Sequence, residues 1–171
     1  MEKKFKHYLV EFDSPQIYCD MDGVLADFDK GIKDMIGGKF SDKRWDELPD
    51  DFFLQLEPMP DAKKLWDFIG KYDPFILTAV PRSERGPISR RAVEDKTRFM
   101  KRWFGVSADK MYPVMRKHKA NFAMDGRDHR PNLLIDDHLG NIQEFRKARG
   151  IGVHHTSASN TIKQLKEIGY K

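Results

Sequence analysis

Two aspartates separated by one methionine, Asp20 and Asp22, are the first residues of this chain whose types and spacing could do chemistry. They follow an apolar run that reads as a strand, and side chains two positions apart on a strand point to the same side. Both carboxylates are therefore expected to converge where the strand ends, and such a pair needs a cation or a shared proton to coexist. Gly23 follows at once and allows a sharp turn or a close approach to a ligand. Asp and Gly are also common in solvated turns without a function, so this pair alone does not distinguish a functional site from an ordinary turn.

Further polar side chains follow other apolar runs that read as strands. Thr78 lies at the end of one run, and Asp136 and Asp137 end another. Lys117 and Lys119 come after a third, shorter run. Carboxylates from two strands, together with a lysine and a hydroxyl, suit a divalent cation and a phosphoryl group. Because the candidate ligands are all oxygens, Mg²⁺ is favoured over zinc or copper.

Strands that alternate with helices are expected to position these groups. Apolar runs predict strands over residues 16–21, 75–79, 132–137 and 150–154, a short one over 111–115, and a candidate edge strand over 5–12. Helical spacing predicts helices over 28–36, 62–71 (capped by Asp61), 90–104 and 141–149, and a last one capped by Asn160. This alternation predicts an α/β fold with a doubly wound, Rossmann-like, mostly parallel sheet. Ligands of such sheets bind beyond the carboxyl ends of the strands, where the polar groups fall.

Composition limits the class of protein. The 171 residues fit one domain with a small insert, and 39% hydrophobic content with a mean hydropathy of −0.69 indicates a globular chain with a polar surface. No apolar run approaches the ~18 residues of a membrane span. The charged N-terminus lacks the apolar core of a signal sequence. The single cysteine, Cys19, forms no internal disulfide, so we expect a cytoplasmic protein.

The net charge of +4 is unevenly distributed. Residues 81–102 hold eight Arg and Lys against three Asp and Glu, whereas residues 27–72 hold eight against eleven. Because the segment that follows the opening aspartates is acidic overall, a nucleic-acid partner is not expected. The sequence does not indicate an oligomeric state.

The order of the polar groups resembles the four motifs of the haloacid dehalogenase-like phosphohydrolase superfamily, which read here DMDGVLAD, ILT, a lysine and LLIDD. Within that superfamily the chain is most similar to the 5′(3′)-deoxyribonucleotidases, which share the longer string at residues 20–28. Similar segments also lie at residues 52–60 and 101–105. The resemblance extends in segments over residues 16–155.

The resemblance implies a covalent mechanism. Asp20 would attack phosphorus and form an aspartyl-phosphate. Asp22 would protonate the leaving alkoxide and later deprotonate the attacking water. Mg²⁺ would lie between Asp20, the backbone carbonyl of Asp22, and the pair formed by Asp136 and Asp137. Which member of that pair binds the cation directly is left open.

The resemblance also implies a phosphate-binding set. Thr78 and a lysine would hold phosphoryl oxygens and neutralise developing charge. Ala79 takes the next phosphate-binding position, where the nucleotidases usually carry serine, so one donor is missing. Lys119 is favoured over Lys117, because residues 119–123 resemble the start of the family's short helix after the third motif.

A small helical cap is implied after the first motif. It would span residues 28–72 with its return helix, and the core would comprise residues 1–27 and 73–171. Phe28 matches the pocket aromatic that stacks on the base, and Trp45 would be a second wall. Other rings, Phe40 and Phe53 among them, are assigned to the cap's own core.

The implied function is a Mg²⁺-dependent phosphatase of (deoxy)nucleoside monophosphates, a small-molecule phosphomonoesterase. Two alternatives stay open. The basic segment at residues 81–102 would suit a phosphatase of nucleic-acid 3′-phosphate ends, although such an enzyme needs a groove with interleaved basic and aromatic residues. The second alternative is a non-catalytic binding protein with the same fold. The presence of all the residues that the catalytic mechanism requires argues against it.

Overall fold

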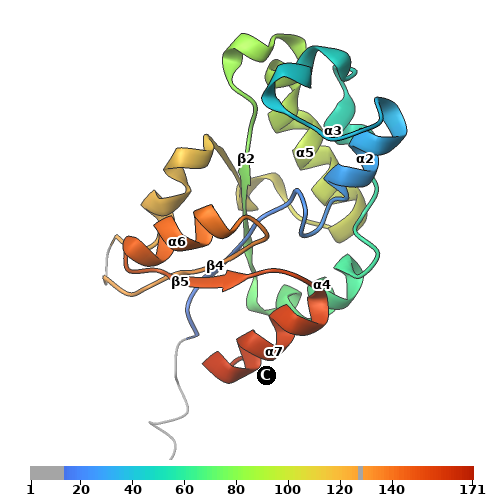
Figure 1. Cartoon of the computed structure of the whole chain (residues 1–171). Coiled ribbons are helices and arrows are strands. Elements are labelled where there is room, and N and C mark those ends of the chain that lie inside the picture. The colour runs from blue at the N-terminus through green and yellow to red at the C-terminus, as the bar shows by residue number, and fades with distance from the viewer. Residues whose placement is uncertain (1–13, 127–128) are drawn as a thin grey trace, which may run out of the picture.

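The computed structural model describes residues 14–126 and 129–171, and the candidate edge strand at 5–12 lies outside them. Five strands form one sheet in the order β3-β2-β1-β4-β5, with every neighbouring pair parallel. Their bounds are β1 Ile17–Cys19, β2 Phe75–Ala79, β3 Met111–Val114, β4 Leu133–Asp136 and β5 Ile151–His154. The predicted α/β fold with a doubly wound parallel sheet is confirmed (Figure 1).

Helices connect and cover the strands. The α-helices are α2 Phe28–Met35, α3 Phe52–Gln55, α4 Ala62–Ile69, α5 Pro87–Phe104, α6 Leu139–Lys147 and α7 Ala158–Ile168. Short 3₁₀ segments are η1 Asp42–Glu47, η2 Gly70–Tyr72, η3 Ser83–Arg85, η4 Ala108–Lys110 and η5 Arg116–Phe122. Within the described residues, no helix combines the length and apolar content that crossing a bilayer requires.

The sheet is buried on both faces. On one face, strand residues such as Ile17 pack with apolar side chains of α4, α5 and α7. On the other face, Leu77 and Leu134 pack with Ile142 and Phe145 of α6. Because strand side chains alternate between the two faces, a sheet covered on both sides requires near-continuous apolar strands. This is why the strands were visible in the sequence as apolar runs.

The chain order places the topological switch point at β1. From β1 the chain runs outward through β2 and β3, then crosses back to add β4 and β5 on the other side. Cys19 is in register with Ile135, and the Asp20 backbone N–H donates to the Ile135 carbonyl at 2.8 Å. The carboxyl ends of β1 and β4 therefore open into one crevice, as expected for a ligand site in a sheet of this type.

The segment between β1 and α4 forms short helices. Figure 1 shows α2 and α3 grouped beside α5, and Phe52 and Phe53 of α3 are buried. Rings of this segment and the end of β1 line a common cavity, which is described below. The division into a core and a cap at residues 28–72 stays a prediction.

Of the two predicted helix caps, Asp61 is confirmed as the N-cap residue of α4, whereas Asn160 is wrong for α7. The Asp61 side chain makes no capping hydrogen bond to α4; instead its Oδ2 accepts from the Ala158 backbone N–H at 2.7 Å, at the start of α7. The cap of α7 is Ser157, whose Oγ accepts from the Asn160 backbone N–H at 3.1 Å. Asp61 thus joins two helices that pack together, a tertiary contact that no local pattern shows.

Other boundaries differ by a few residues. Helix α5 begins three residues before the prediction, with Pro87 in its first turn, where the missing N–H costs no intrahelical bond. Helix α6 begins two residues early, at Leu139, with His138 as its N-cap. Strand β3 tolerates Pro113 because it lies at the edge of the sheet.

Candidate active site

Three carboxylates from two neighbouring strands meet at the switch point. Asp20 directly follows β1, Asp136 ends β4 and Asp137 follows it, and their oxygens lie within 4.8 Å of one another. Asp20 and Asp136 are buried, whereas Asp137 is exposed and lines the cavity. The predicted pairing of the first and last motifs in space is what the structure shows.

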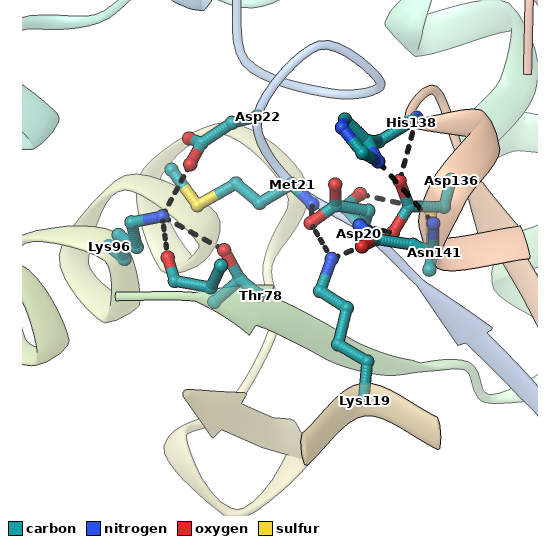
Figure 2. Close-up of polar contacts among 11 residues, drawn as sticks. Asp20, Met21, Asp22, Thr78, Lys96, Lys119, Asp136, His138 and Asn141 are labelled. Carbon is teal, nitrogen blue, oxygen red and sulfur yellow. Dashed lines mark hydrogen bonds and ion pairs between the residues drawn. The ribbon is translucent and has the colours of Figure 1, made fainter. Parts of the chain in front are cut away.

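Lys119 lies between two of these carboxylates. Its Nζ is 2.9 Å from Asp20 Oδ1 and 2.8 Å from Asp136 Oδ2, and the side chain is buried (Figure 2). Burial alone would lower the pKa of the Lys119 ammonium, but Asp20 and Asp136 outweigh it and hold that pKa above its ordinary value. Lys117, two residues earlier on η5, is exposed to solvent.

Asp136 is held firmly by its surroundings. Its Oδ1 accepts from the His138 backbone N–H at 2.8 Å. Its Oδ2 accepts from Asn141 Nδ2 at 2.9 Å, in addition to the Lys119 ammonium. Both oxygens therefore have protein donors, which fixes the carboxylate at the start of α6.

The cluster carries more negative charge than its protein partners neutralise. Burial, with the charges of Asp136 and Asp22 added and that of Lys119 opposing, raises the pKa of the Asp20 carboxyl to about 7. Loss of solvent, followed by the charge of Asp136, raises the pKa of Asp137 to about 6. A cation bound to these oxygens would relieve the repulsion.

The carboxylate of Asp22 does not join this cluster, which corrects the expectation that both aspartates converge. Strand β1 ends at Cys19, so strand alternation no longer applies, and a turn at Gly23 (φ +79°) follows. Asp22 Oδ2 instead accepts from Lys96 Nζ at 2.5 Å. Figure 2 shows Asp22 and Lys96 on one side of Asp20, and Asp136 on the other. Both Asp20 and Asp22 still line the same cavity.

The predicted phosphate-binding residues of β2 lie beside Lys96. Thr78 Oγ1 accepts from Lys96 Nζ at 2.9 Å, and the Ala79 carbonyl accepts from it at 2.7 Å. Thr78 is fully buried. Among the described residues that line the cavity, Ala79 is present and Thr78 is not.

A cavity of about 910 Å³ opens above the carboxylates. Phe28 and Trp45, the predicted substrate walls, both line it. Phe40 and Phe53 line it as well, although Phe53 is buried in the hydrophobic core and Phe40 packs against that core. The Phe40 ring packs edge-on against both predicted walls, 5.3 Å from Phe28 and 4.9 Å from Trp45 between ring centroids. The cavity is therefore lined both by aromatic rings from the segment after β1 and by carboxylates and Lys119.

Comparison with known proteins identifies the relatives of this chain. A protein of Vibrio phage KVP40 named "Putative 5'(3')-deoxyribonucleotidase" is 31% identical over 132 residues, which cover 75% of this chain and 69% of the relative. This chain belongs to the 5′(3′)-deoxyribonucleotidase family. The family suggested by the motifs is thereby confirmed, while the wider superfamily stays a prediction. No protein-family model matches the chain.

Lys96 is a residue of the site that the sequence analysis did not predict. The fold brings it beside Asp22, Thr78 and Ala79. By charge alone, Lys96 is one of several basic residues in the predicted helix at 90–104. Ala92, Lys96 and Met100 follow one another at four-residue steps, and all three are fully buried. A lysine at this spacing lies on the apolar face of the helix, and this position could have identified Lys96 as a buried, functional charge.

Gly23 is required by close packing as well as by its positive φ. A Cβ built on it would lie 2.2 Å from Asp137 Oδ2. Glycine thus lets the carboxylate after β4 approach the turn after β1. The turn at Gly23 and the carboxylate of Asp137 therefore pack directly against each other.

Proposed function

We propose that this protein is a Mg²⁺-dependent phosphomonoesterase that dephosphorylates (deoxy)nucleoside monophosphates through an aspartyl-phosphate on Asp20. The observation that carries the proposal is the buried set of Asp20, Asp136 and Lys119 beside a cavity that Asp20 and Lys119 line together with aromatic rings. The relative in phage KVP40 bears a nucleotidase name, which agrees with this reading.

The carboxylates fit a magnesium ion. Their oxygens are close enough to share one cation, and all-oxygen ligands suit Mg²⁺. Asp136 already has protein donors on both oxygens, whereas Asp137 is exposed to the cavity. Asp20, Asp137 and the backbone carbonyl of Asp22 would therefore hold the ion, with Asp136 orienting Lys119. When bound, Mg²⁺ would screen the anionic nucleophile from the anionic substrate.

The residues of the chain would act in two steps. In the first, an Asp20 carboxylate oxygen forms a bond to phosphorus while the bond from phosphorus to the sugar oxygen breaks, and Asp22 gives that oxygen a proton. In the second, water gives a proton to Asp22 and bonds to phosphorus, and the bond to Asp20 breaks. The products are the nucleoside and inorganic phosphate, and both aspartates return to their starting state.

Lys119 and Thr78 would bind the transferring phosphoryl group. Contacts with described residues use two of the three Lys119 donors, which leaves one for a phosphoryl oxygen. The Thr78 hydroxyl is buried behind the cavity lining, where it accepts from Lys96, so its own proton stays available for donation to a phosphoryl oxygen bound beside Ala79. Fixed donors of this kind stabilise charge that develops in the transition state.

The proposed function is tested by phosphate release from dTMP compared with a 3′-phosphorylated oligonucleotide. We expect release from dTMP with Mg²⁺, loss of activity with a chelator, and poor replacement by calcium, which prefers larger and looser coordination. Preference for the oligonucleotide would favour a nucleic-acid end phosphatase. Binding of dTMP without phosphate release, with Mg²⁺ present, would favour a non-catalytic member.

The aromatic wall predicts a selective effect of Phe28→Ala. A ring stacked on a base contributes ~1–3 kcal/mol without reading its identity, so KM for dTMP should rise between about fivefold and about 150-fold. KM for p-nitrophenyl phosphate, which lacks a base, should change little. Steady-state kinetics on both substrates measures this difference. Equal changes would mean that Phe28 only packs against Phe40 and Phe52.

A further inference from the structure

Lys96 is a buried charge whose hydrogen bonds are all made within the protein. It lies in the middle of α5 with none of its surface exposed. Its Nζ donates to Asp22 Oδ2, Thr78 Oγ1 and the Ala79 carbonyl, at 2.5, 2.9 and 2.7 Å. An ammonium has three donors, so none is left for a substrate oxygen. Lys96 is therefore placed to act on its protein partners and not on the phosphate.

We propose that Lys96 is a positioning residue that anchors the Asp22 carboxylate by Oδ2 and thereby presents Oδ1 to the leaving-group oxygen. The inference rests on the proposed phosphatase function. Asp22 Oδ1 is buried and has no hydrogen-bond partner among the described residues, although Asp22 lines the cavity. An unpaired buried oxygen is costly, and it is the atom expected to exchange a proton with the substrate.

Asp22 needs such an anchor because it lies beyond the end of β1, in an isolated bridge with Ala26 that fixes its backbone but not its side chain. Asp20 is fixed by its sheet pairing and by the Met21 backbone N–H, which donates to its Oδ1 at 2.8 Å. For Asp22, Lys96 is the side-chain partner that the structure gives, and the carboxylate is 22% exposed against 8% for Asp20. Without Lys96, several rotamers of Asp22 would be open to solvent.

Lys96 is itself held rigidly. Besides its two contacts on β2, its Nζ lies 4.3 Å from the centroid of the Phe53 ring, a cation–π arrangement. Thr78 and Ala79 belong to a strand inside the sheet, so they do not depend on Lys96 for their position. Removing the ammonium should therefore disturb Asp22 first.

The experiment is kcat/KM for two phenyl phosphates with Lys96→Met. A p-methoxyphenolate leaving group needs a proton as it departs, whereas p-nitrophenolate does not. Neither substrate carries a base, so the aromatic wall is not tested. The value kcat/KM reports only the steps up to departure of the phenol, so the later hydrolysis does not enter.

We expect kcat/KM for p-methoxyphenyl phosphate to fall about 100-fold in Lys96→Met and that for p-nitrophenyl phosphate to stay within about threefold. Lys101→Met, an exposed lysine on the same helix, should leave both values unchanged. Thermal unfolding shows whether Lys96→Met, whose thioether suits the contact with Phe53, still folds. If it does not, the same ratio is read on Lys96→Gln, which keeps an N–H donor.

A second measurement separates positioning from a general loss of structure. In an Asp22→Asn background the carboxylate is already gone, so Lys96→Met should lower kcat/KM for p-methoxyphenyl phosphate no further. Equal losses on the two substrates in the single variant, or a full further loss in the double variant, would overturn the proposal. A wild-type protein inactive on both phenyl phosphates and on dTMP would instead overturn the phosphatase function itself.

Discussion

Asp20→Asn will lose phosphatase activity by at least about 10⁴-fold while keeping the wild-type fold. The amide has nearly the shape of the carboxylate and can still accept from the Met21 N–H and from Lys119. It cannot attack phosphorus, because its oxygen is a poor nucleophile. Phosphate release from dTMP with Mg²⁺ measures the loss, and circular dichroism measures the fold.

The same variant should unfold at or above the wild-type temperature when Mg²⁺ is absent. Asparagine removes one negative charge from a group of three carboxylates, two of them buried, which repel one another. Asp34→Asn, on the exposed side of α2, is the matched control and should keep full activity. Turnover of p-nitrophenyl phosphate by Asp20→Asn at a near wild-type rate would remove the covalent mechanism.

Lys119→Met should lower kcat by about 10²–10³-fold, because a fixed donor aimed at developing charge contributes effects of this size. The loss should be similar for dTMP and p-nitrophenyl phosphate, since both transfer the same phosphoryl group. The variant should also unfold at a lower temperature, because Asp20 and Asp136 lose the ammonium that they share. Steady-state kinetics and a thermal melt measure the two effects.

Lys117→Met is the matched control for this substitution. Lys117 is exposed, two residues away on the same 3₁₀ segment, and should retain kcat within about threefold, as surface lysines generally do. Loss of activity by orders of magnitude in Lys117→Met, with Lys119→Met unaffected, would reverse the assignment of the phosphate lysine.

The fold could be predicted from the sequence because its strands are buried on both faces. Leu133, Leu134 and Ile135 are all fully buried, so the whole strand is apolar and visible without periodicity. Helix caps were harder, because a side chain such as Asp61 can serve a helix distant in sequence. The contact from Asp61 to Ala158 depends on how α4 and α7 pack, which no local pattern encodes.

The site was partly predictable for a similar reason. Asp20 and Asp136 end neighbouring strands, and topology alone brings strand ends together. Asp22 was misplaced because strand alternation was extended past Cys19, where the chain already turns. Lys96 was not predicted because only its charge was considered. Its four-residue spacing from Ala92 and Met100 already indicated that it lies on the buried face of α5.

Chemical trapping of the phosphorylated enzyme tests the central claim most directly. An acyl phosphate is reduced by borohydride to an alcohol, so an aspartyl-phosphate becomes homoserine in the peptide chain. Wild-type protein quenched with borohydride during turnover of dTMP with Mg²⁺ should carry homoserine at position 20 when its peptides are analysed by mass spectrometry. Protein quenched without substrate should carry aspartate there. Rapid turnover with no homoserine at position 20, or with homoserine at another aspartate, would contradict the account.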